Sequence, residues 1–312
     1  MALNTNQHYF DISIQNPEAL DLRYAHIAWD PNLDLYIKTT KQIKELLATI
    51  KQLKAHGRNA DDFYEELYAI FIKRIASKNE LNCFVNACDC STGVLKTEWA
   101  DNNKQLFINI VDLYLQHRDF TDQTPREWVQ ALIDKGASRA DGKVGENKLV
   151  EIAQNAGFVL VDNWGDFIAN GKVVAVFKKG VFDRRRILEN LGVDLQFNAQ
   201  DKMLDVILKN GDKYVFIEAK HMKECGGSQD KQIKELIDII RTDTNNDNVK
   251  YVAFLDGFYS NLLLKDIRNP IDKDAKTPNQ QRDINTALAA NSNSYWLNTA
   301  GFNKFVHDFV QD

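Results

Sequence analysis

Cysteine, proline and long apolar runs are all scarce in this sequence. Its 312 residues include only 4 cysteines and 5 prolines. No apolar run approaches the roughly 18 residues of a membrane span, and the N-terminus is polar, unlike a secretion signal. Four cysteines are also too few for a disulfide scaffold in a chain of this length. These absences predict a soluble, intracellular protein that does not contact a membrane.

Three of the cysteines lie close together, at Cys83, Cys88 and Cys90. A structural zinc site needs four ligands, and the second Cys-x₂-Cys or His-x₃-His pair that usually completes it does not occur nearby. Only the distant His117 and Cys225 remain as candidates. We therefore predict reduced, partly buried thiols at these positions instead of a zinc centre.

Positive charge is not in excess, because the sequence has 39 Lys and Arg residues and 44 Asp and Glu residues, which gives a net charge of −5. This balance weighs against a nucleic-acid partner, although phosphate binding requires basic residues on one face only. A local basic cluster does exist, and a solvated charged surface is its alternative interpretation. Its members are Lys172, Lys178, Lys179, Arg184, Arg185 and Arg186.

Apolar spacing divides the chain into two parts near residue 136. The first part shows helical periodicity over 33–54, 61–76, 105–117 and 124–135, whereas residues 1–32 show no strong period. The second part begins with a helix at 145–156 and then becomes rich in β-strand patterns. With 44% hydrophobic and 27% charged residues, both parts have the composition of globular protein.

The pattern of the second part predicts a central mixed β-sheet flanked by helices. Residues 137–312 are therefore expected to form an α/β or α+β fold. Residues 1–136 form a separate helical region in this interpretation. We expect strands at 173–177, 193–197, 203–208, 214–220 and 251–255. We also expect helices at 229–241 and 302–310, with a loop rich in Pro, Asn and Asp at 269–285.

The most informative segment is a predicted hairpin, MLDVILKNGDKYVFIEAKH, over residues 203–221. Asn210-Gly211 is a strong turn signal, and side chains two apart on a strand share a face, so Glu218 and Lys220 point the same way. A two-residue loop places Asp205 diagonally next to Glu218, and a four-residue loop places it directly opposite. A three-residue loop separates the two side chains. Either even loop length brings both carboxylates within reach of one cation.

Two carboxylates and a lysine suit the hydrolysis of phosphodiester bonds. Mg²⁺ typically takes one or two carboxylates, with water and substrate phosphate as further ligands, and the backbone carbonyl of Ala219 is another candidate ligand. Lys220 is then placed to orient or deprotonate the attacking water and to stabilise the transition state. The alternative is that Asp205 and Glu218 are ordinary charges at the end of a sheet, with Lys220 paired to one of them.

Asp205, twelve intervening residues and Glu218-Ala219-Lys220 resemble the signature of the PD-(D/E)xK nuclease superfamily. The following glycine-bearing loop, the glutamine-rich helix start and the strand YVAFLDG resemble type II restriction endonucleases in particular. The resemblance covers roughly residues 139–257. One departure is Leu204, which stands where the family name has a proline.

The resemblance implies a site-specific endodeoxyribonuclease of a prokaryotic cytoplasm that cuts double-stranded DNA with Mg²⁺, or with Mn²⁺ as a substitute. It implies Asp205, Glu218 and Lys220 as catalytic residues, and Glu146, on the preceding helix, as a fourth. A homodimer is expected, because cutting both strands requires two active centres. Candidate DNA contacts are the basic and glutamine side chains of Lys178, Lys179, Arg184, Arg185, Arg186, Gln229 and Gln232.

Three alternatives remain open at this point. The chain is either another nuclease of the same superfamily, acting in repair or recombination, or a DNA-binding module that has lost catalysis. The third alternative is an unrelated protein with a chance motif. The recognition sequence lies beyond what residue spacing reveals, because it depends on which side chains reach base edges.

Overall fold

The computed structural model describes residues 3–25, 27–88, 95, 100–119, 121, 123–135, 142–195, 203–222, 227–242, 246–264 and 276–312. The chain forms two compact units. Residues 1–25 and 140–312 make the first, here called the sheet unit, and residues 26–139 make the second, the helical unit. Each has a hydrophobic core of its own.

The helical unit confirms the helical periodicity of the first part of the sequence. Its apolar stripes meet in one core, which includes the fully buried Leu67, Phe71, Phe107 and Val111. Its helices are α2 (Leu33–Ala55), α3 (Asp61–Phe71), α4 (Glu80–Ala87), α6 (Ala100–His117) and α7 (Arg126–Asp134), with the 3₁₀ turn η2 (Arg74–Ser77).

The sheet unit is built on a mixed sheet whose described strands follow sequence order. They are β1 (Val159–Leu160), β2 (Lys172–Val176), β3 (Val206–Asn210), β4 (Lys213–His221), β5 (Val249–Asp256) and β6 (Ser294–Leu297). The pairs β2–β3 and β3–β4 are antiparallel, whereas β1–β2, β4–β5 and β5–β6 are parallel. The predicted fold class is confirmed.

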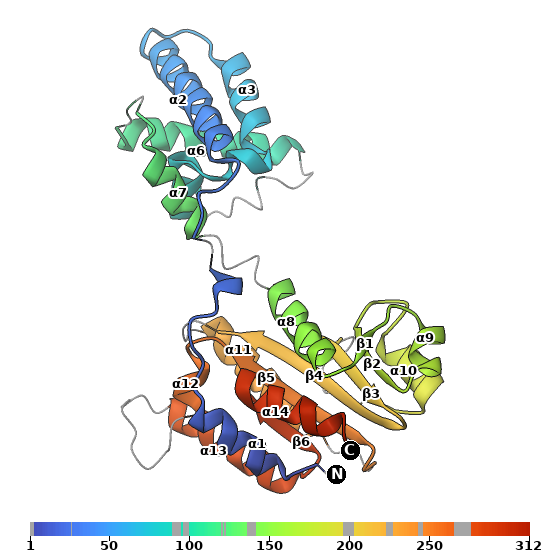
Figure 1. The fold of residues 1–312 in the computed structure, drawn as a ribbon. Helices are drawn as coiled ribbons and strands as arrows, with labels where there is room; N and C mark the ends of the chain where they lie inside the picture. The colour runs from blue at the N-terminus through green and yellow to red at the C-terminus, as the bar shows by residue number, and fades with distance from the viewer. Residues whose placement is uncertain are drawn as a thin grey trace. The chain divides into compact units, whose positions relative to one another are not determined.

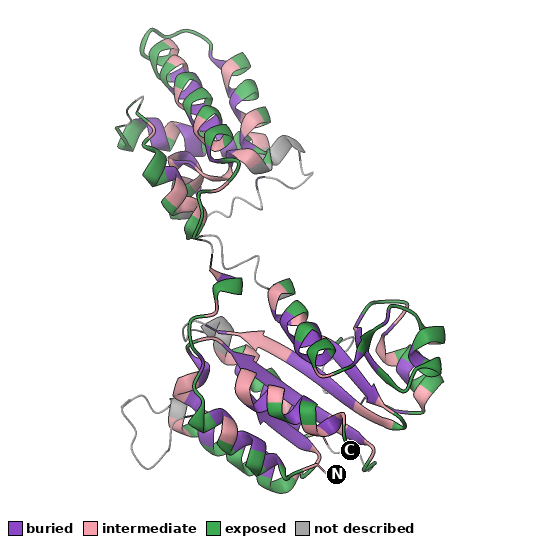
Figure 2. Cartoon of the chain, viewed as in Figure 1, coloured by how far each residue is buried: buried purple, intermediate pink, exposed green. Residues whose placement is uncertain are grey.

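Helices cover both faces of this sheet, so its central strands are buried (Figures 1 and 2). The helices α8 (Gly142–Asn155) and α14 (Thr299–Phe309) pack on the face that carries Val215 and Ile217. The helices α10 (Arg184–Leu191) and α11 (Gly227–Ile240) pack on the other face. The remaining elements are α1 (Asn6–Gln15), η1 (Leu22–Tyr24), α9 (Trp164–Ala169), α12 (Ser260–Leu263) and α13 (Lys276–Ala290).

The first 25 residues differ from the sequence expectation in both structure and location. They were expected to be irregular and to belong to a helical region 1–136, but they contain α1 and join the sheet unit. The reason is long-range packing, because Tyr9 contacts the aromatic rings of Tyr295 and Phe305 and is fully buried there. The side chain of Asn6 also donates hydrogen bonds to the carbonyls of Leu288 and Ser294.

Two local expectations in the second part were wrong. No strand forms in the described part of 193–197, because Gly192 ends α10 in the left-handed conformation, and Val193 and Leu195 are buried without strand pairing. The expected loop 269–285 contains the first ten residues of α13, and the rest of it lies outside the described residues. None of the helices in the described ranges is long and apolar enough to cross a membrane.

Candidate active site

The predicted hairpin is present, with a turn one residue later than expected. Asn210 pairs with Lys213, so the two turn residues are Gly211, at φ +63°, and Asp212. Asn210 stays in the ladder, where its side chain donates a hydrogen bond of 2.7 Å to the carbonyl of Phe309. The resulting register equals the one expected for the longer loop.

This register brings Asp205 next to Glu218 at the end of the hairpin. Val206 pairs with Ile217, and one step further the backbone N–H of Asp205 donates to the Ile217 carbonyl at 2.9 Å. The carboxylate of Asp205 then accepts a hydrogen bond of 2.7 Å from the backbone N–H of Ala219. The two acidic residues predicted from the sequence are therefore brought together by backbone pairing.

Burial and repulsion from Glu218 change the protonation of Asp205. The pKa of Asp205 is raised to about 7, mainly by burial and secondly by the negative charge of Glu218. The N–H of Ala219 and the ammonium of Lys220 act in the opposite direction but do not cancel the shift. A cation next to the half-buried Asp205 and the buried Glu218 would be favourable, because it offsets the negative charge of both carboxylates.

Lys220 is held as a cation against Glu218. Its Nζ lies 2.5 Å from Glu218 Oε1 and 3.9 Å from Oε2 of Glu235, a residue of α11. Burial alone would lower the pKa of Lys220, but the charge and hydrogen bond of Glu218 outweigh it and raise the pKa. In this arrangement Lys220 is suited to electrostatic stabilisation, and not to deprotonation of water, as its ammonium already carries the proton.

Glu146 lies on α8, which packs on the face of the sheet opposite to Glu218. Burial raises the pKa of the Glu146 carboxyl, with Lys143 acting in the opposite direction. Its charge is also among the causes that raise the pKa of Asp205, so the two side chains share one electrostatic environment. A place for Glu146 beside Asp205 and Glu218 remains a prediction.

The donor set around Asp205 and Glu218 fits Mg²⁺. Mg²⁺ prefers oxygen ligands and commonly uses one or two carboxylates together with water. The half-buried Asp205 and the buried Glu218 provide such ligands. The carbonyl of Ala219 remains a predicted third oxygen. No cluster of three or more His, Cys, Asp or Glu side chains with metal-binding geometry occurs among the described residues.

The predicted DNA-contacting residues come from α10, the turn before it, and α11. Asp183 caps α10 by accepting from the Arg186 N–H, and each arginine of this helix has a carboxylate neighbour within 3.2–3.7 Å, either Asp194 or Glu189. Lys178 and Lys179 are exposed in the turn, and Gln232 is half-buried on α11. The side chain of Gln229 lies outside the described residues. Contacts of these residues with DNA remain predictions.

The cysteines are only partly described. Cys83 is exposed and Cys88 is half-buried, and both are free thiols. Cys90 and Cys225 lie outside the described residues, so the prediction of reduced thiols is untested for them.

A second polar cluster was missed by sequence reasoning. Lys148, only 1% exposed, lies 2.7 Å from Oδ2 of Asp256 and 3.0 Å from Oδ2 of Asp21. His221 Nδ1 lies 2.8 Å from Oδ1 of Asp256, which confirms that His221 points away from the face of Glu218. The available signals were a lysine within the apolar pattern of α8 and an aspartate that ends the apolar strand β5, but nothing in their spacing links them.

A family model, the Tsp45I type II restriction enzyme, matches residues 188–295 of the chain. The match spans about a third of the chain and includes Asp205, Glu218 and Lys220, whereas Glu146 and the helical unit lie outside it. It supports the predicted resemblance to type II restriction endonucleases. No curated protein and no solved structure matches the chain significantly.

Proposed function

We propose that this protein is a type II restriction endonuclease that uses Mg²⁺ to hydrolyse phosphodiester bonds at a specific sequence in double-stranded DNA. The observation that carries the proposal is the pairing of Asp205 with Glu218 at the end of the β3–β4 hairpin, with Lys220 in contact. This hairpin lies within the segment that matches the restriction enzyme family. The cellular setting implied is the cytoplasm of a prokaryote.

In this proposal Asp205 and Glu218 hold the metal ion, together with the carbonyl of Ala219. When bound, Mg²⁺, or Mn²⁺ in its place, offsets charge that develops on the phosphate and lowers the pKa of a bound water. Lys220 stabilises the same charge through its ammonium group. Glu146 supplies a further carboxylate toward the metal and its water ligands from α8.

DNA binding is assigned to the surface around α10 and to the helical unit. The exposed Lys178, Lys179 and Arg185 are suited to phosphate contacts, since phosphate recognition requires accessible positive charge. Arg184 and Arg186 join them once the DNA phosphates replace their present carboxylate neighbours. Gln232, half-buried on α11, is assigned to DNA contact as well, as is Gln229, whose side chain lies outside the described residues. The helical unit, residues 26–139, serves recognition or dimerisation, and two copies of the chain place one active centre on each strand.

The test is cleavage of several plasmid and phage DNAs with Mg²⁺ by the native chain, Asp205→Ala and Lys220→Ala. Discrete fragments are expected from the native chain alone, with a loss of about 10³-fold or more in the variants because transition-state charge loses its partners. Lys213→Ala is the matched control, since Lys213 lies at the other end of the same strand and pairs with the C-terminal Asp312.

Other outcomes identify the alternatives. Cleavage without sequence preference would favour a repair or recombination nuclease. DNA binding with no cleavage, in Mg²⁺ and in Mn²⁺, would favour an inactive DNA-binding module. Neither binding nor cleavage would leave the motif as a chance pattern and overturn the proposal.

A further inference from the structure

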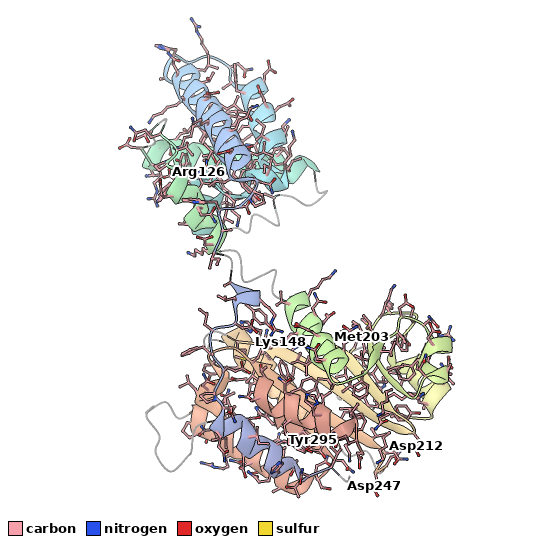
Figure 3. All side chains as sticks on the ribbon, viewed as in Figure 1. Arg126, Lys148, Met203, Asp212, Asp247 and Tyr295 are labelled. Carbon is pink, nitrogen blue, oxygen red and sulfur yellow. The ribbon has the colours of Figure 1, made fainter. Side chains whose placement is uncertain are left out.

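Asp256, at the end of β5, joins three segments of the sheet unit that are distant in sequence. Its Oδ2 accepts hydrogen bonds from Lys148 at 2.7 Å and from the hydroxyl of Tyr24 at 3.0 Å. Its Oδ1 lies 2.8 Å from Nδ1 of His221. Asp256 and Lys148 are each only 1% exposed, so these contacts replace nearly all of their hydration. Lys148 lies on α8 and is labelled in Figure 3.

A set of four residues that contact one another is here called the Asp256 network; its members are Asp256, Tyr24, Lys148 and His221. The ring of Tyr24 stacks on the ring of His221, with centroids 3.6 Å apart and planes 11° from parallel. Gly257 follows directly at φ +86°, and a Cβ added there would lie 2.4 Å from the carbonyl oxygen of Met222. The ends of β4 and β5 are therefore locked together with little free space.

This network is adjacent to the proposed catalytic residues but does not include them. His221 directly follows Lys220 on β4 and pairs with Asp256 across the parallel ladder, on the opposite face from Glu218. Lys148 lies two residues after Glu146 on the same helix. Holding His221 in place consequently constrains the end of β4, where Glu218 lies next to Asp205.

The network also lies where the sheet unit connects to the helical unit. The chain leaves the sheet unit after Ala25 and returns at Ala140, so Tyr24 precedes one connection and Lys148 follows the other. The segment before Tyr24 is anchored as well, since the carboxylate of Glu18 accepts a 2.6 Å hydrogen bond from the Thr299 N–H and Asp21 pairs with Lys148. Tyr24 and Asp21 on one segment and Lys148 on the other are thereby joined at the end of β5, beside the end of β4.

We propose that Tyr24, Lys148 and His221 are positioning residues that act through Asp256 to hold the end of β4 in the geometry that binds the metal ion. The inference rests on the proposed nuclease function. None of the four side chains touches the metal or the DNA in this assignment. They set how well Glu218, Lys220 and Asp205 are aligned.

The test is Tyr24→Phe, which removes one hydroxyl from Asp256 and leaves the ring that stacks on His221. Tyr9→Phe is the matched control, because the buried Tyr9 also donates to a carboxylate, Asp308 at 2.9 Å, within the same unit. For Tyr24→Phe we expect about tenfold slower single-turnover cleavage and about three- to tenfold weaker Mg²⁺ binding without DNA, while DNA affinity stays unchanged. Tyr9→Phe is expected to keep all three values native.

A second matched pair separates positioning from general stability. Lys148→Met removes the buried ammonium of the network, and Lys209→Met removes another buried ammonium, one that donates to the carbonyls of Phe167, Ile168 and Asn170 near the opposite end of the sheet. Both variants are expected to lower the melting temperature. Only Lys148→Met is expected to slow cleavage and weaken Mg²⁺ binding when each is assayed well below its melting temperature.

The outcomes of these measurements separate the positioning role from the proposed function. Native values for Tyr24→Phe, or equal losses in the control variants, would overturn the positioning role while the proposed function stands. A native chain that neither binds Mg²⁺ in calorimetry nor cuts DNA would overturn the proposed function, and this inference with it.

Discussion

The environment of Asp205 differs from that of an ordinary surface carboxylate. It is held by the Ala219 N–H, close to Glu218, where burial and repulsion raise its pKa to about 7. A proton and a metal ion therefore compete for the same oxygens near neutral pH. Two measurable consequences follow, one for metal binding and one for stability.

The affinity for Mg²⁺ should rise as the pH rises through 7. Below that pH the Asp205 carboxyl is protonated and neutral, so binding a cation requires loss of the proton, and the affinity falls by about tenfold per pH unit. Above it the carboxylate is already charged and the affinity levels off. Calorimetric titrations with Mg²⁺ at pH 6, 7 and 8 measure this trend, and an affinity independent of pH over that range would contradict it.

Asp205→Asn should stabilise the metal-free protein at pH 8. The unfolded chain loses this proton near the ordinary value of 3.8 and the folded chain only at about 7, so stability falls as the pH rises between those values and stays low above them. Removing the charge recovers roughly 1–3 kcal/mol of unfolding free energy. Urea unfolding at pH 8 is the measurement. The control is pH 4, where the folded Asp205 is neutral and the variant is expected to match the native chain.

At the scale of elements, the β3–β4 hairpin brings the acidic residues together because its pairing is local. Gly211 lies in the turn at φ +63°, and the register follows from there to Val206 and Ile217. The sequence predicted the hairpin and left two loop lengths open. In the observed register the side chain of Asn210 donates a hydrogen bond to the carbonyl of Phe309, 99 residues away. The spacing of residues in the sequence does not reveal this tertiary contact.

Gly257→Ala should destabilise the sheet unit more than Gly180→Ala does. Both glycines have positive φ, at +86° and +81°, so both substitutions add backbone strain of about 1 kcal/mol. Only at Gly257 would the new Cβ also meet the Met222 carbonyl oxygen, at 2.4 Å, which adds roughly 1–3 kcal/mol for the required backbone shift. Denaturant unfolding measures both. Equal losses of unfolding free energy in the two variants would mean that the backbone at the end of β5 shifts away from the new Cβ without loss of stability.

At the scale of the whole molecule, the two units differ in how their chain segments are arranged. The helical unit is one continuous segment with its own buried core, whereas the sheet unit requires residues 1–25 in addition to 140–312. The early segment contributes Tyr9 and Phe10 to the cores of the sheet unit. Because a domain folds alone only when its core is complete, the two units should respond differently to excision.

A fragment of residues 26–139 should unfold cooperatively by itself, with the circular dichroism of a helical protein. A fragment of residues 140–312 should not, because removing α1 exposes the apolar surfaces of β6 and α14 against which it packs. Adding a peptide of residues 1–25 in excess should restore part of its cooperative melt. A cooperative melt of 140–312 without the peptide would contradict the assigned role of α1.

The sequence by itself determined the features that depend on local backbone geometry. The helices of the first part, the hairpin and the shared face of Glu218 and Lys220 all follow from periods of 3.6 and 2 residues and from a turn glycine. The position of His221 on the opposite face follows from the same alternation. These features, together with the spacing from Asp205, were sufficient for the nuclease interpretation that the family match supports.

Only the tertiary structure decided which distant segments meet. The joining of α1 to the sheet unit and the burial of Lys148 against Asp256 each link residues far apart in sequence. Periodicity shows which face of an element is buried but not which element covers it. The raised pKa of Asp205 is likewise decided by the tertiary structure, because it arises from desolvation by the complete fold and from charges on several elements.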